Sequence, residues 1–282
     1  MHRTTQNIAI LHPGQMGISI AANLQLSGHS IHWLSADRSA QTRRRAEEHE
    51  LIAGASLANL CRQCSVIISV CPPHAADDVA RQVADAGFHG LYIDANAIAP
   101  ARSRQLADII EGAGGSFVDG GIIGGPAWEP GTSLYLSGPR AQEAATLFTS
   151  GPLAVQVIDE EIGKASALKM CYAAYSKGST ALLAAALAAA EALDVRRHLE
   201  EKWTEDEEGF VPKAHNRTRQ VSAKAWRFAS EMAEIAATFE AANLPPGFHQ
   251  AAEELYQRLA HFKDRDEIPK LVEVLTALRK RD

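Results

Sequence analysis

The stretch IAILHPGQMGISIA, residues 8–21, decides the fold expected for this chain of 282 residues. An apolar run leads into two glycines, Gly14 and Gly17, and apolar residues at helical spacing follow. This order predicts a strand, a tight turn and a helix. Glycines in such a turn let a phosphate approach the N–H groups that open the helix. His12 replaces the first glycine of the pattern G-x-G-x-x-G, so the stretch predicts an incomplete dinucleotide-binding turn. The candidate cofactor residues in it are His12, Pro13, Gly14, Gln15 and Met16.

Short apolar runs alternate with amphipathic stretches from residue 7 to residue 157, which is typical of βα units in a mostly parallel sheet. The expected strands are residues 7–11, 30–34, 66–70, 91–94, 116–120, 132–137 and 155–157. The expected helices between them are residues 16–26, 40–48, 75–84 and 101–111. The sequence therefore predicts an α/β fold with a Rossmann-type, doubly wound sheet.

The second part of the chain has a different pattern. Strand-like runs stop after residue 162, and residues 164–193 form an alanine-rich stretch that favours a long helix. The further segments expected to be helical are residues 194–208, 215–243, 247–263 and 268–281. We therefore expect a dinucleotide-binding domain over residues 1–160 and an all-α C-terminal domain for substrate binding or dimerisation over residues 161–282. Small side chains on the long helix allow close packing of a second copy, which predicts a homodimer.

Composition limits the partners. The formal net charge is -6, and a protein that binds nucleic acid or an anionic membrane needs a basic surface. No apolar run is long enough to span a bilayer. Four cysteines in 282 residues do not form a disulfide framework, which favours a reducing, cytoplasmic compartment. We expect a small-molecule partner, with no nucleic acid and no membrane.

Cys61 and Cys64 have the C-x-x-C spacing of zinc and redox sites. A zinc site would need a second pair of ligands, and none is placed nearby, so no metal is expected. A redox pair would stand at the start of a helix after a strand, whereas these cysteines end an expected helix. A redox protein that uses Cys61 and Cys64 remains an alternative to the reading of a nucleotide-binding protein.

The end of the second expected strand bears on the choice of cofactor. An acidic side chain there would bind the ribose hydroxyls of NAD and repel a 2′-phosphate, but the residue is Ser35. Arg38 follows, and a guanidinium with nearby hydroxyls suits a 2′-phosphate. Asp37 favours the opposite choice. The sequence predicts NADP, with NAD as the alternative.

Four separated segments resemble one family. They are HPGQMG (12–17), VCPP (70–73), DANAIAP (94–100) and VDGGIIGGPAWEPGTSLYLSG (118–138). The chain resembles the β-hydroxyacid dehydrogenase and 6-phosphogluconate dehydrogenase superfamily, which includes imine reductases. The resemblance implies that a loop with Cys71, Pro72 and Pro73 passes the nicotinamide ribose. It also implies that Asn96, in a segment where the family has Asp-x-Ser/Thr-x-x-x-Pro, contacts cofactor or substrate.

A fifth segment, GKASALKMCYAAYSKG (163–178), resembles the family's Gly-x-Gly-x-x-x-Lys-x-x-Asn signature. The resemblance implies that Lys169 is the catalytic lysine. Two departures accompany it, because Tyr172 replaces the signature asparagine and Ile123 replaces the substrate-binding serine. An apolar pocket with Trp128 would suit a bulkier or less polar substrate than a small 3-hydroxy acid. The candidate substrate residues are Asn96, Ile122, Ile123, Gly124 and Tyr172.

These features together lead to one expected function and one rival. We expect an NADP-dependent oxidoreductase that transfers a hydride between nicotinamide and a hydroxy acid or a related carbonyl or imine compound. Lys169 would donate or accept the proton. The rival is a non-catalytic NAD(P)-binding sensor, which the loss of the family's serine and asparagine favours.

Overall fold

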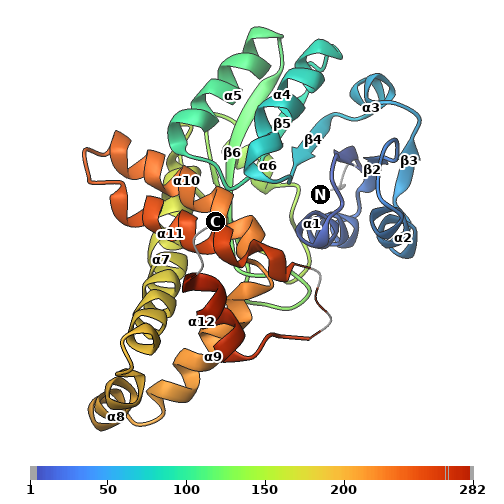
Figure 1. Ribbon diagram of the computed structural model, residues 1–282. Coiled ribbons are helices and arrows are strands. Elements are labelled where there is room, and N and C mark those ends of the chain that lie inside the picture. Colours follow the sequence, from blue (N-terminus) through green and yellow to red (C-terminus); the bar gives the residue numbers. More distant parts are fainter. Residues whose placement is uncertain (1–4, 264, 266, 280–282) are drawn as a thin grey trace. The chain divides into compact units, whose positions relative to one another are not determined.

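The computed structural model describes residues 5–263, 265 and 267–279 (Figure 1). The chain forms two compact units, one reaching to Met170 and the other starting at Cys171. The division lies inside one helix, α7 (Lys164–Ala192), later in the chain than the domain boundary expected after residue 160.

The first unit is built on a sheet of eight described strands. They are β1 (Asn7–Ile10), β2 (Ser30–Leu34), β3 (Ile52–Gly54), β4 (Val66–Ser69), β5 (Leu91–Asp94), β6 (Ser116–Ile123), β7 (Ser133–Ser137) and β8 (Ala154–Asp159). Their order is β3-β2-β1-β4-β5-β6-β7-β8. Among the described pairs, β6 and β7 are antiparallel and the others are parallel. The predicted Rossmann-type sheet is confirmed.

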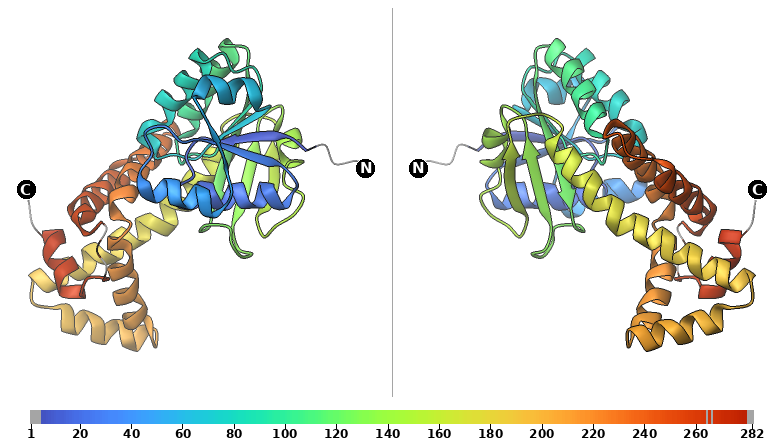
Figure 2. Two further views of the ribbon diagram at one scale, coloured as in Figure 1. Left: turned by 90° about the vertical axis from the view of Figure 1, so that its right-hand side faces the viewer. Right: turned by 90° about the vertical axis from the view of Figure 1, so that its left-hand side faces the viewer.

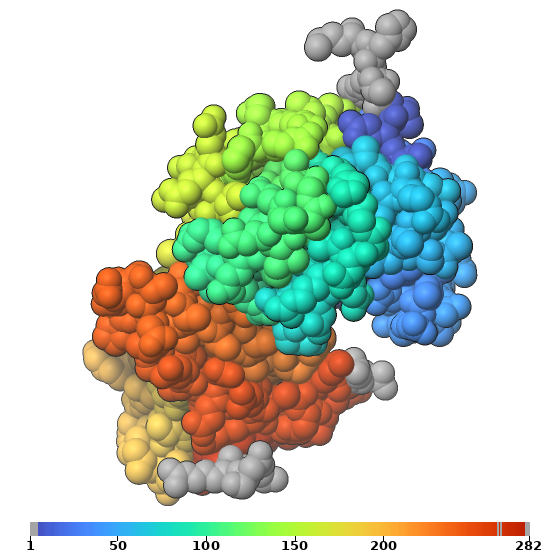
Figure 3. All heavy atoms as spheres, turned by 90° about the horizontal axis from the view of Figure 1, so that it is seen from above, coloured from blue at the N-terminus to red at the C-terminus, as the bar shows by residue number. Residues whose placement is uncertain are grey.

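Helices cover both faces of this sheet (Figure 2). They are α1 (Gln15–Leu26), α2 (Ala40–Glu48), α3 (Leu57–Gln63), α4 (Ala76–Asp85), α5 (Pro100–Gly112) and α6 (Ala141–Ala145). Because side chains alternate along a strand, Ile8 and Ile10 enter one apolar core while Ala9 enters the other. Helices α4 and α5 lie side by side on the surface (Figure 3).

Two elements of the first unit were not predicted, and both are short. Strand β3 has three residues and lies at the sheet edge, where Ile52 is exposed and gives no alternating pattern. Helix α6 has five residues, too few to show a helical period.

The second unit is helical, as expected. After the C-terminal part of α7 it contains α8 (Arg196–Asp206), α9 (Phe210–Ser222), α10 (Ala225–Ala241), α11 (Gly247–Leu259) and α12 (Leu271–Arg279). The segment 215–243, expected as one helical stretch, belongs to two helices that are separated at Ala223 and Lys224. Residues 280 and 281 of the last expected segment lie outside the described residues. A buried ion pair between Lys177 and Glu231 joins α7 to α10. Among the described residues, no helix combines the length and the apolar character that a membrane crossing needs.

Candidate functional site

The strand order changes direction between β1 and β4. Strand β1 has β2 on one side and β4 on the other, so the loops that leave the carboxyl ends of β1 and β4 diverge. Ligands of open α/β sheets bind in the crevice at such a switch point. The residues of these two loops therefore border the crevice in which a ligand is expected.

The turn after β1 contains two glycines with different surroundings. A Cβ on Gly17 would lie 2.2 Å from the carbonyl oxygen of His12, so only glycine fits where α1 packs against the turn. A Cβ on Gly14 would meet nothing within 4 Å. Gly14 also caps α1 without a side-chain hydrogen bond to the first turn of that helix. The space beside Gly14 is therefore not used by the described part of the protein.

His12 lies in the same turn and is half-buried. Its Nδ1 atom is buried and has no hydrogen-bond partner among the described residues. Burial, and secondly the nearby Arg38 guanidinium, lower the pKa of His12 to about 4, so its imidazole is neutral at pH 7. His12 and Arg38 line one cavity of about 270 Å³. The other lining residues are Leu11, Leu34, Leu57, Ala75, Asp78, Val79 and Gln82.

Arg38 follows the end of β2, and backbone atoms hold it and its neighbours. Its Nε donates to the carbonyl oxygen of Leu34 at 3.4 Å, and partial burial lowers the pKa of its guanidinium. Arg45 donates through Nη1 to the carbonyl oxygen of Pro13 at 3.3 Å. Ser35, directly after β2, is half-buried. The structure thus brings Arg38 to the cavity beside the first turn and ties Arg45 to the turn itself.

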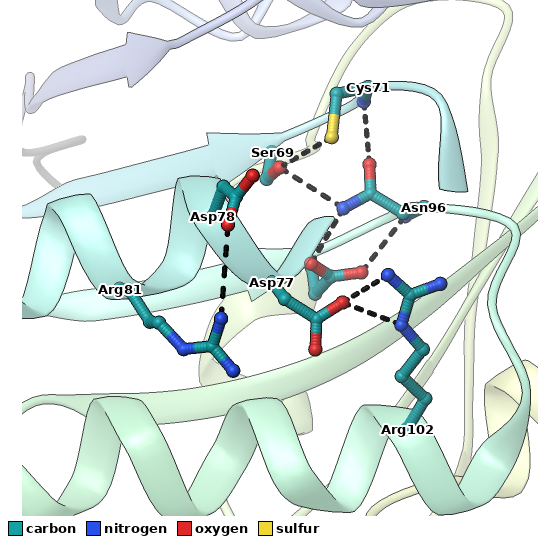
Figure 4. A network of polar contacts seen from close by, with 8 residues as sticks. Ser69, Cys71, Asp77, Asp78, Arg81, Asn96 and Arg102 are labelled. Atoms are coloured by element: carbon teal, nitrogen blue, oxygen red, sulfur yellow. Dashed lines mark hydrogen bonds and ion pairs between the residues drawn. The ribbon is translucent and has the colours of Figure 1, made fainter. Parts of the chain in front are cut away.

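The loop after β4 is held by hydrogen bonds (Figure 4). The backbone N–H of Cys71 donates to Oδ1 of Asn96 at 2.6 Å, and Nδ2 of Asn96 donates to the Ser69 hydroxyl at 3.1 Å. The same Nδ2 donates to Asp94 at 2.7 Å. Pro72 and Pro73 follow directly, and Pro73 opens a short 3-10 helix. Asn96 therefore lies 2% exposed with its amide turned into the protein, where it binds the loop rather than standing open to solvent.

Asp119 in β6 is a buried carboxylate that sequence reasoning did not single out. It accepts hydrogen bonds from the hydroxyls of Ser103, Ser137 and Ser166, at 2.9, 3.0 and 2.6 Å. It also accepts from the backbone N–H groups of Gly163 and Ser166, at 3.0 and 2.9 Å. These bonds fix the start of α7 on β6. In the sequence, Asp119 stands among small residues in the segment 118–138, which was the available signal for a special role. Its partners Ser103, Gly163 and Ser166 come from other segments, so the hydrogen bonds could not be predicted.

Lys169 is placed by the contact of α7 with β6. A Cβ on Gly121 would lie 2.6 Å from the carbonyl oxygen of Ala165 and 3.1 Å from the Cβ of Lys169, so glycine permits this close approach. Asp94, the last residue of β5, pairs with Asp119 of β6, and Gly121 therefore lies beyond the carboxyl end of β5. Lys169 is half-buried at the edge of the sheet where ligands of this fold class bind.

The chemistry of Cys61 and Cys64 does not resemble that of a redox pair. Both are free and buried, at the end of α3. Burial raises the pKa of both thiols, that of Cys64 to about 12, so neither is a ready thiolate. Within the described ranges, no group of three or more potential metal ligands is found.

A family model described as the NAD binding domain of 6-phosphogluconate dehydrogenase matches residues 7–147. That match covers half of the chain. The chain belongs to the β-hydroxyacid and 6-phosphogluconate dehydrogenase superfamily. A second model, a domain of unknown function (DUF1932), matches residues 190–259. The first unit is thus an NAD(P)-binding domain of the dehydrogenase and reductase type.

Two known proteins are similar to this chain in sequence. An uncharacterised 28.5 kDa protein of Methanothermus fervidus is 26% identical over 202 residues, which are 71% of this chain and 78% of that protein. The mitochondrial 3-hydroxyisobutyrate dehydrogenase of Drosophila melanogaster is 27% identical over 137 residues, which are 47% of this chain but only 42% of that enzyme.

Solved structures extend the likeness over nearly the whole chain. A conserved hypothetical protein of Sinorhizobium meliloti has a TM-score of 0.70 at 25% identity, and the matched region covers 98% of this chain and 96% of that chain. The 3-hydroxyisobutyrate dehydrogenase of Mycobacterium tuberculosis has a TM-score of 0.72 at 19% identity, with 98% and 100% covered. An imine reductase of Myxococcus stipitatus with NADP⁺ has a TM-score of 0.56 at 17% identity, with 97% and 100% covered. The last two likenesses concern the fold.

Ile123 and Tyr172 stand at the positions for which the family resemblance implies a serine and an asparagine. Ile123 is half-buried and ends β6, and Tyr172 is 53% exposed on α7. Ile122, also expected in the pocket, lies 5% exposed in the apolar core of the sheet. Gly124 is exposed with φ +127°, and a Cβ there would lie 2.5 Å from the Thr132 hydroxyl oxygen. The structure therefore leaves Ile123 and Gly124, rather than Ile122, at the end of β6.

Trp128 follows in the loop after β6. It is 48% exposed and stacks on His49 with ring centroids 5.1 Å apart. Nδ2 of Asn23 donates to the carbonyl oxygen of Ala127 at 3.0 Å and holds this loop to α1. Trp128 is thus partly used in packing against the C-terminal end of α2.

Proposed function

We propose that this protein is an NADP-dependent oxidoreductase that transfers a hydride between nicotinamide and a hydroxy acid or a related carbonyl or imine compound. The observation that carries the proposal is the position of Lys169. Its Cβ is held close to Gly121, beyond the carboxyl end of β5, on the edge of the sheet that carries both switch-point loops. A proton donor there would stand beside a nicotinamide bound in the crevice.

The turn after β1 supports binding of the cofactor's pyrophosphate. The unused space beside Gly14 and the uncapped first turn of α1 suit a phosphate, because backbone N–H groups and the helix dipole favour an anion there. Arg38 in the cavity next to His12 supports a 2′-phosphate and thus NADP over NAD. The proposed cofactor residues in the turn and after β2 are His12, Pro13, Gly14, Gln15, Met16, Ser35 and Arg38. Cys71, Pro72 and Pro73 would flank the nicotinamide half.

Lys169 would move the proton while the bound nicotinamide supplies or accepts the hydride. In the reductive direction its ammonium donates a proton to a carbonyl oxygen or an imine nitrogen. In the oxidative direction its neutral amine accepts the proton of a hydroxyl group. The proton and the hydride together account for the two hydrogens gained or lost by the substrate.

The substrate is proposed to be less polar than a small 3-hydroxy acid. Ile123 cannot donate the hydrogen bond that a serine gives to a carboxylate, and Tyr172 replaces a short amide by a phenol. Substrate recognition would then depend on apolar contact at Ile123 and on the phenol of Tyr172.

The test combines cofactor binding with turnover in one set of variants. Wild type is first screened with NADPH against ketones, cyclic imines and keto acids, and with NADP⁺ against hydroxy acids. Lys169→Ala is expected to bind NADPH nearly as wild type does while turnover falls by about two orders of magnitude or more. Lys164→Ala is the matched control, because Lys164 is an exposed lysine on the same helix as Lys169 and pairs with Glu161, which precedes that helix.

Each outcome of this test is informative. An unchanged rate in Lys169→Ala would contradict the role of the lysine. Tight NADPH binding by wild type without turnover of any compound would favour the non-catalytic sensor. The replacement of the family's serine and asparagine also favours that alternative. Loss of NADPH binding in Lys169→Ala would mean that the lysine contributes to cofactor binding or to the stability of the fold rather than to proton transfer.

A homodimer remains part of the proposal. Tyr175 and Leu182 on α7 are 82% and 56% exposed, which is a large apolar surface for a single helix. A second copy packed on this surface would cover both side chains. Light scattering at micromolar concentration should give the mass of two chains, and the mass of one chain would contradict it.

A further inference from the structure

The side chain of Asn96 joins the loops that follow β4 and β5. Its Oδ1 accepts from the N–H of Cys71, and its Nδ2 donates both to Ser69 and to Asp94 (Figure 4). The backbone N–H of Asn96 donates to the other oxygen of Asp94 at 3.1 Å. The side-chain NH₂ group donates to two acceptors, Ser69 and Asp94, and the side-chain oxygen accepts from the backbone N–H of Cys71. The chain Asp94–Asn96–Cys71 therefore connects a buried carboxyl to the backbone of the loop.

The orientation of this amide follows from its neighbours. The Cys71 N–H can only donate, so the atom of Asn96 that faces it must be the oxygen. The opposite atom is then the NH₂ group, which needs an acceptor at Asp94. Both oxygens of Asp94 receive an N–H from Asn96, and both bonds are strongest when this carboxyl is ionised. A protonated carboxyl still accepts, but its hydroxyl oxygen is the weaker acceptor and its proton needs a partner of its own.

The surroundings of Asp94 oppose that ionised state. Asp94 is 1% exposed, and burial raises the pKa of its carboxyl to about 7. The like charge of Asp119 on β6 acts in the same direction, while the two Asn96 hydrogen bonds and Arg102 on α5 favour the carboxylate. Arg102 itself is paired with Asp77 on α4. Burial thus favours the protonated carboxyl of Asp94, and the hydrogen bonds from Asn96 favour the ionised one. These two effects oppose each other near neutral pH.

We propose that Asp94 and Asn96 are positioning residues that hold the Cys71–Pro73 loop in the shape that receives the nicotinamide half of the cofactor, and that this hold is strongest when Asp94 is ionised. The inference rests on the proposed function, because it assigns a task to the loop on one side of the proposed cofactor crevice. Neither side chain touches the cofactor. Each acts through the backbone of Cys71, the residue at which the loop leaves the sheet.

The residue type at position 96 supports this assignment. The family pattern places serine or threonine in this segment, and a hydroxyl has one proton to donate. It could not donate to both Ser69 and Asp94 while it accepts from Cys71. Asparagine provides two donors and one acceptor on a planar group, which matches the three partners in the structure.

The first experiment measures the loop without any turnover. Asn96→Ala and Asn96→Thr are compared with wild type by amide hydrogen exchange of the peptide that contains Cys71. The Cys71 amide should be protected in wild type and should exchange at least about tenfold faster in Asn96→Ala, since a hydrogen bond of this kind contributes on the order of 1 kcal/mol or more. Equal protection in both proteins would overturn the proposal. Asn96→Thr should give intermediate protection because its hydroxyl can still accept one bond.

The second experiment measures NADPH affinity by fluorescence from about pH 5.5 to about pH 8.5, a range that brackets the titration of a carboxyl shifted towards neutrality. Wild type should lose affinity as the pH falls and Asp94 takes up a proton. Asp94→Asn imitates the protonated carboxyl, so it should bind about tenfold more weakly at pH 8 and lack that component of the pH dependence. Asp108→Asn, at an exposed aspartate of α5, is the matched control and should behave like wild type.

The outcomes separate this inference from the proposed function. If wild type binds no NADPH at any pH, the proposed function fails, while the hydrogen-exchange result still decides whether Asn96 holds the loop. If wild type binds NADPH and Asp94→Asn shows the same affinity and the same pH dependence, the positioning role fails and the proposed function stands. Thermal unfolding of each variant at pH 8 shows whether a loss of binding merely reflects loss of the fold.

Discussion

The two loops that flank the switch point of the sheet are built in opposite ways. The turn after β1 leaves open space beside Gly14 and a buried Nδ1 of His12 without a partner among the described residues. The loop after β4 is tied down, because the Cys71 N–H is bonded to Asn96 and Asn96 is bonded to Asp94. One side of the crevice keeps its polar groups and space unused, while the other side uses its polar groups on itself.

This difference separates binding from positioning. Groups that the protein does not satisfy are available to a ligand, and their cost to the fold is offset when the ligand arrives. An N–H group that already donates within the protein cannot donate to a ligand without first breaking that bond. We therefore expect changes in the turn after β1 to act on cofactor affinity directly, and changes beneath the loop after β4 to act through loop shape.

The largest expected effect within the turn is that of Gly17→Ala. A Cβ at this position would lie 2.2 Å from the carbonyl oxygen of His12, and the backbone of turn and helix cannot move apart without loss of packing. We expect a loss of about 3 kcal/mol in the free energy of unfolding, measured by urea denaturation. Unchanged stability would show that α1 does not pack as closely on the turn as the structure indicates.

Gly14→Ala should separate binding from stability in the same turn. The φ angle of Gly14 is -67°, which alanine adopts, and the new Cβ meets no protein atom within 4 Å. The unfolding midpoint should stay within a degree or two of wild type, or rise slightly, while the affinity for NADPH falls at least about tenfold. Full NADPH affinity in this variant would mean that no phosphate lies beside Gly14.

The sheet itself was largely predictable from the sequence. Residues 30–34 and 91–94 were assigned to the strands that the structure shows, because both strands are buried and apolar. The three-residue strand β3 and the five-residue helix α6 were missed since neither is long enough to show a period. The turn was found through its glycines, and the pattern itself assigns Gly14 to close approach of a phosphate and Gly17 to helix packing, which agrees with the open space at Gly14 and the close contact at Gly17.

Arg38→Ala tests the choice between the two nicotinamide cofactors. Arg38 lines the cavity beside His12, and a guanidinium bound to a phosphate contributes a charge-assisted hydrogen bond. NADPH affinity should fall about tenfold or more, while NADH affinity should change little. Titration of both cofactors with wild type and variant gives the ratio. An equal loss for both cofactors would contradict recognition of the 2′-phosphate by Arg38.

His12→Gln acts on the pH dependence of stability rather than on the choice of cofactor. The folded protein lowers the pKa of His12 from 6.5 to about 4, so the unfolded chain binds more protons between these values. Stability should therefore decrease as the pH falls from about 6.5 to about 4, and glutamine, which does not titrate, should remove that part of the decrease. Thermal unfolding of both proteins at pH 7 and at pH 5 measures the difference. A parallel loss in the two proteins would show that His12 does not contribute.

Candidate site residues could be singled out where they belong to one local sequence pattern. Contacts that arise from the register of the sheet could not be predicted. As a catalytic residue Lys169 stays a prediction, and it was singled out through a signature within one segment. The polar network beneath the loop was not, because Ser69, Asp94 and Asp119 come together only when β4, β5 and β6 pair in register. Asn96 was predicted to contact cofactor or substrate, which stays a prediction, and its contacts in the structure are with the protein. Ile122 was expected in a pocket and lies in the core, since alternation along β6 turns it away from Gly121.

The comparison of the two loops is tested most directly by titrating the purified protein with NADPH and with NADH and following cofactor fluorescence. The account predicts saturable binding of both, with NADPH bound more tightly than NADH. If neither cofactor binds, the open turn after β1 is not a phosphate site, and both the oxidoreductase and the sensor are contradicted.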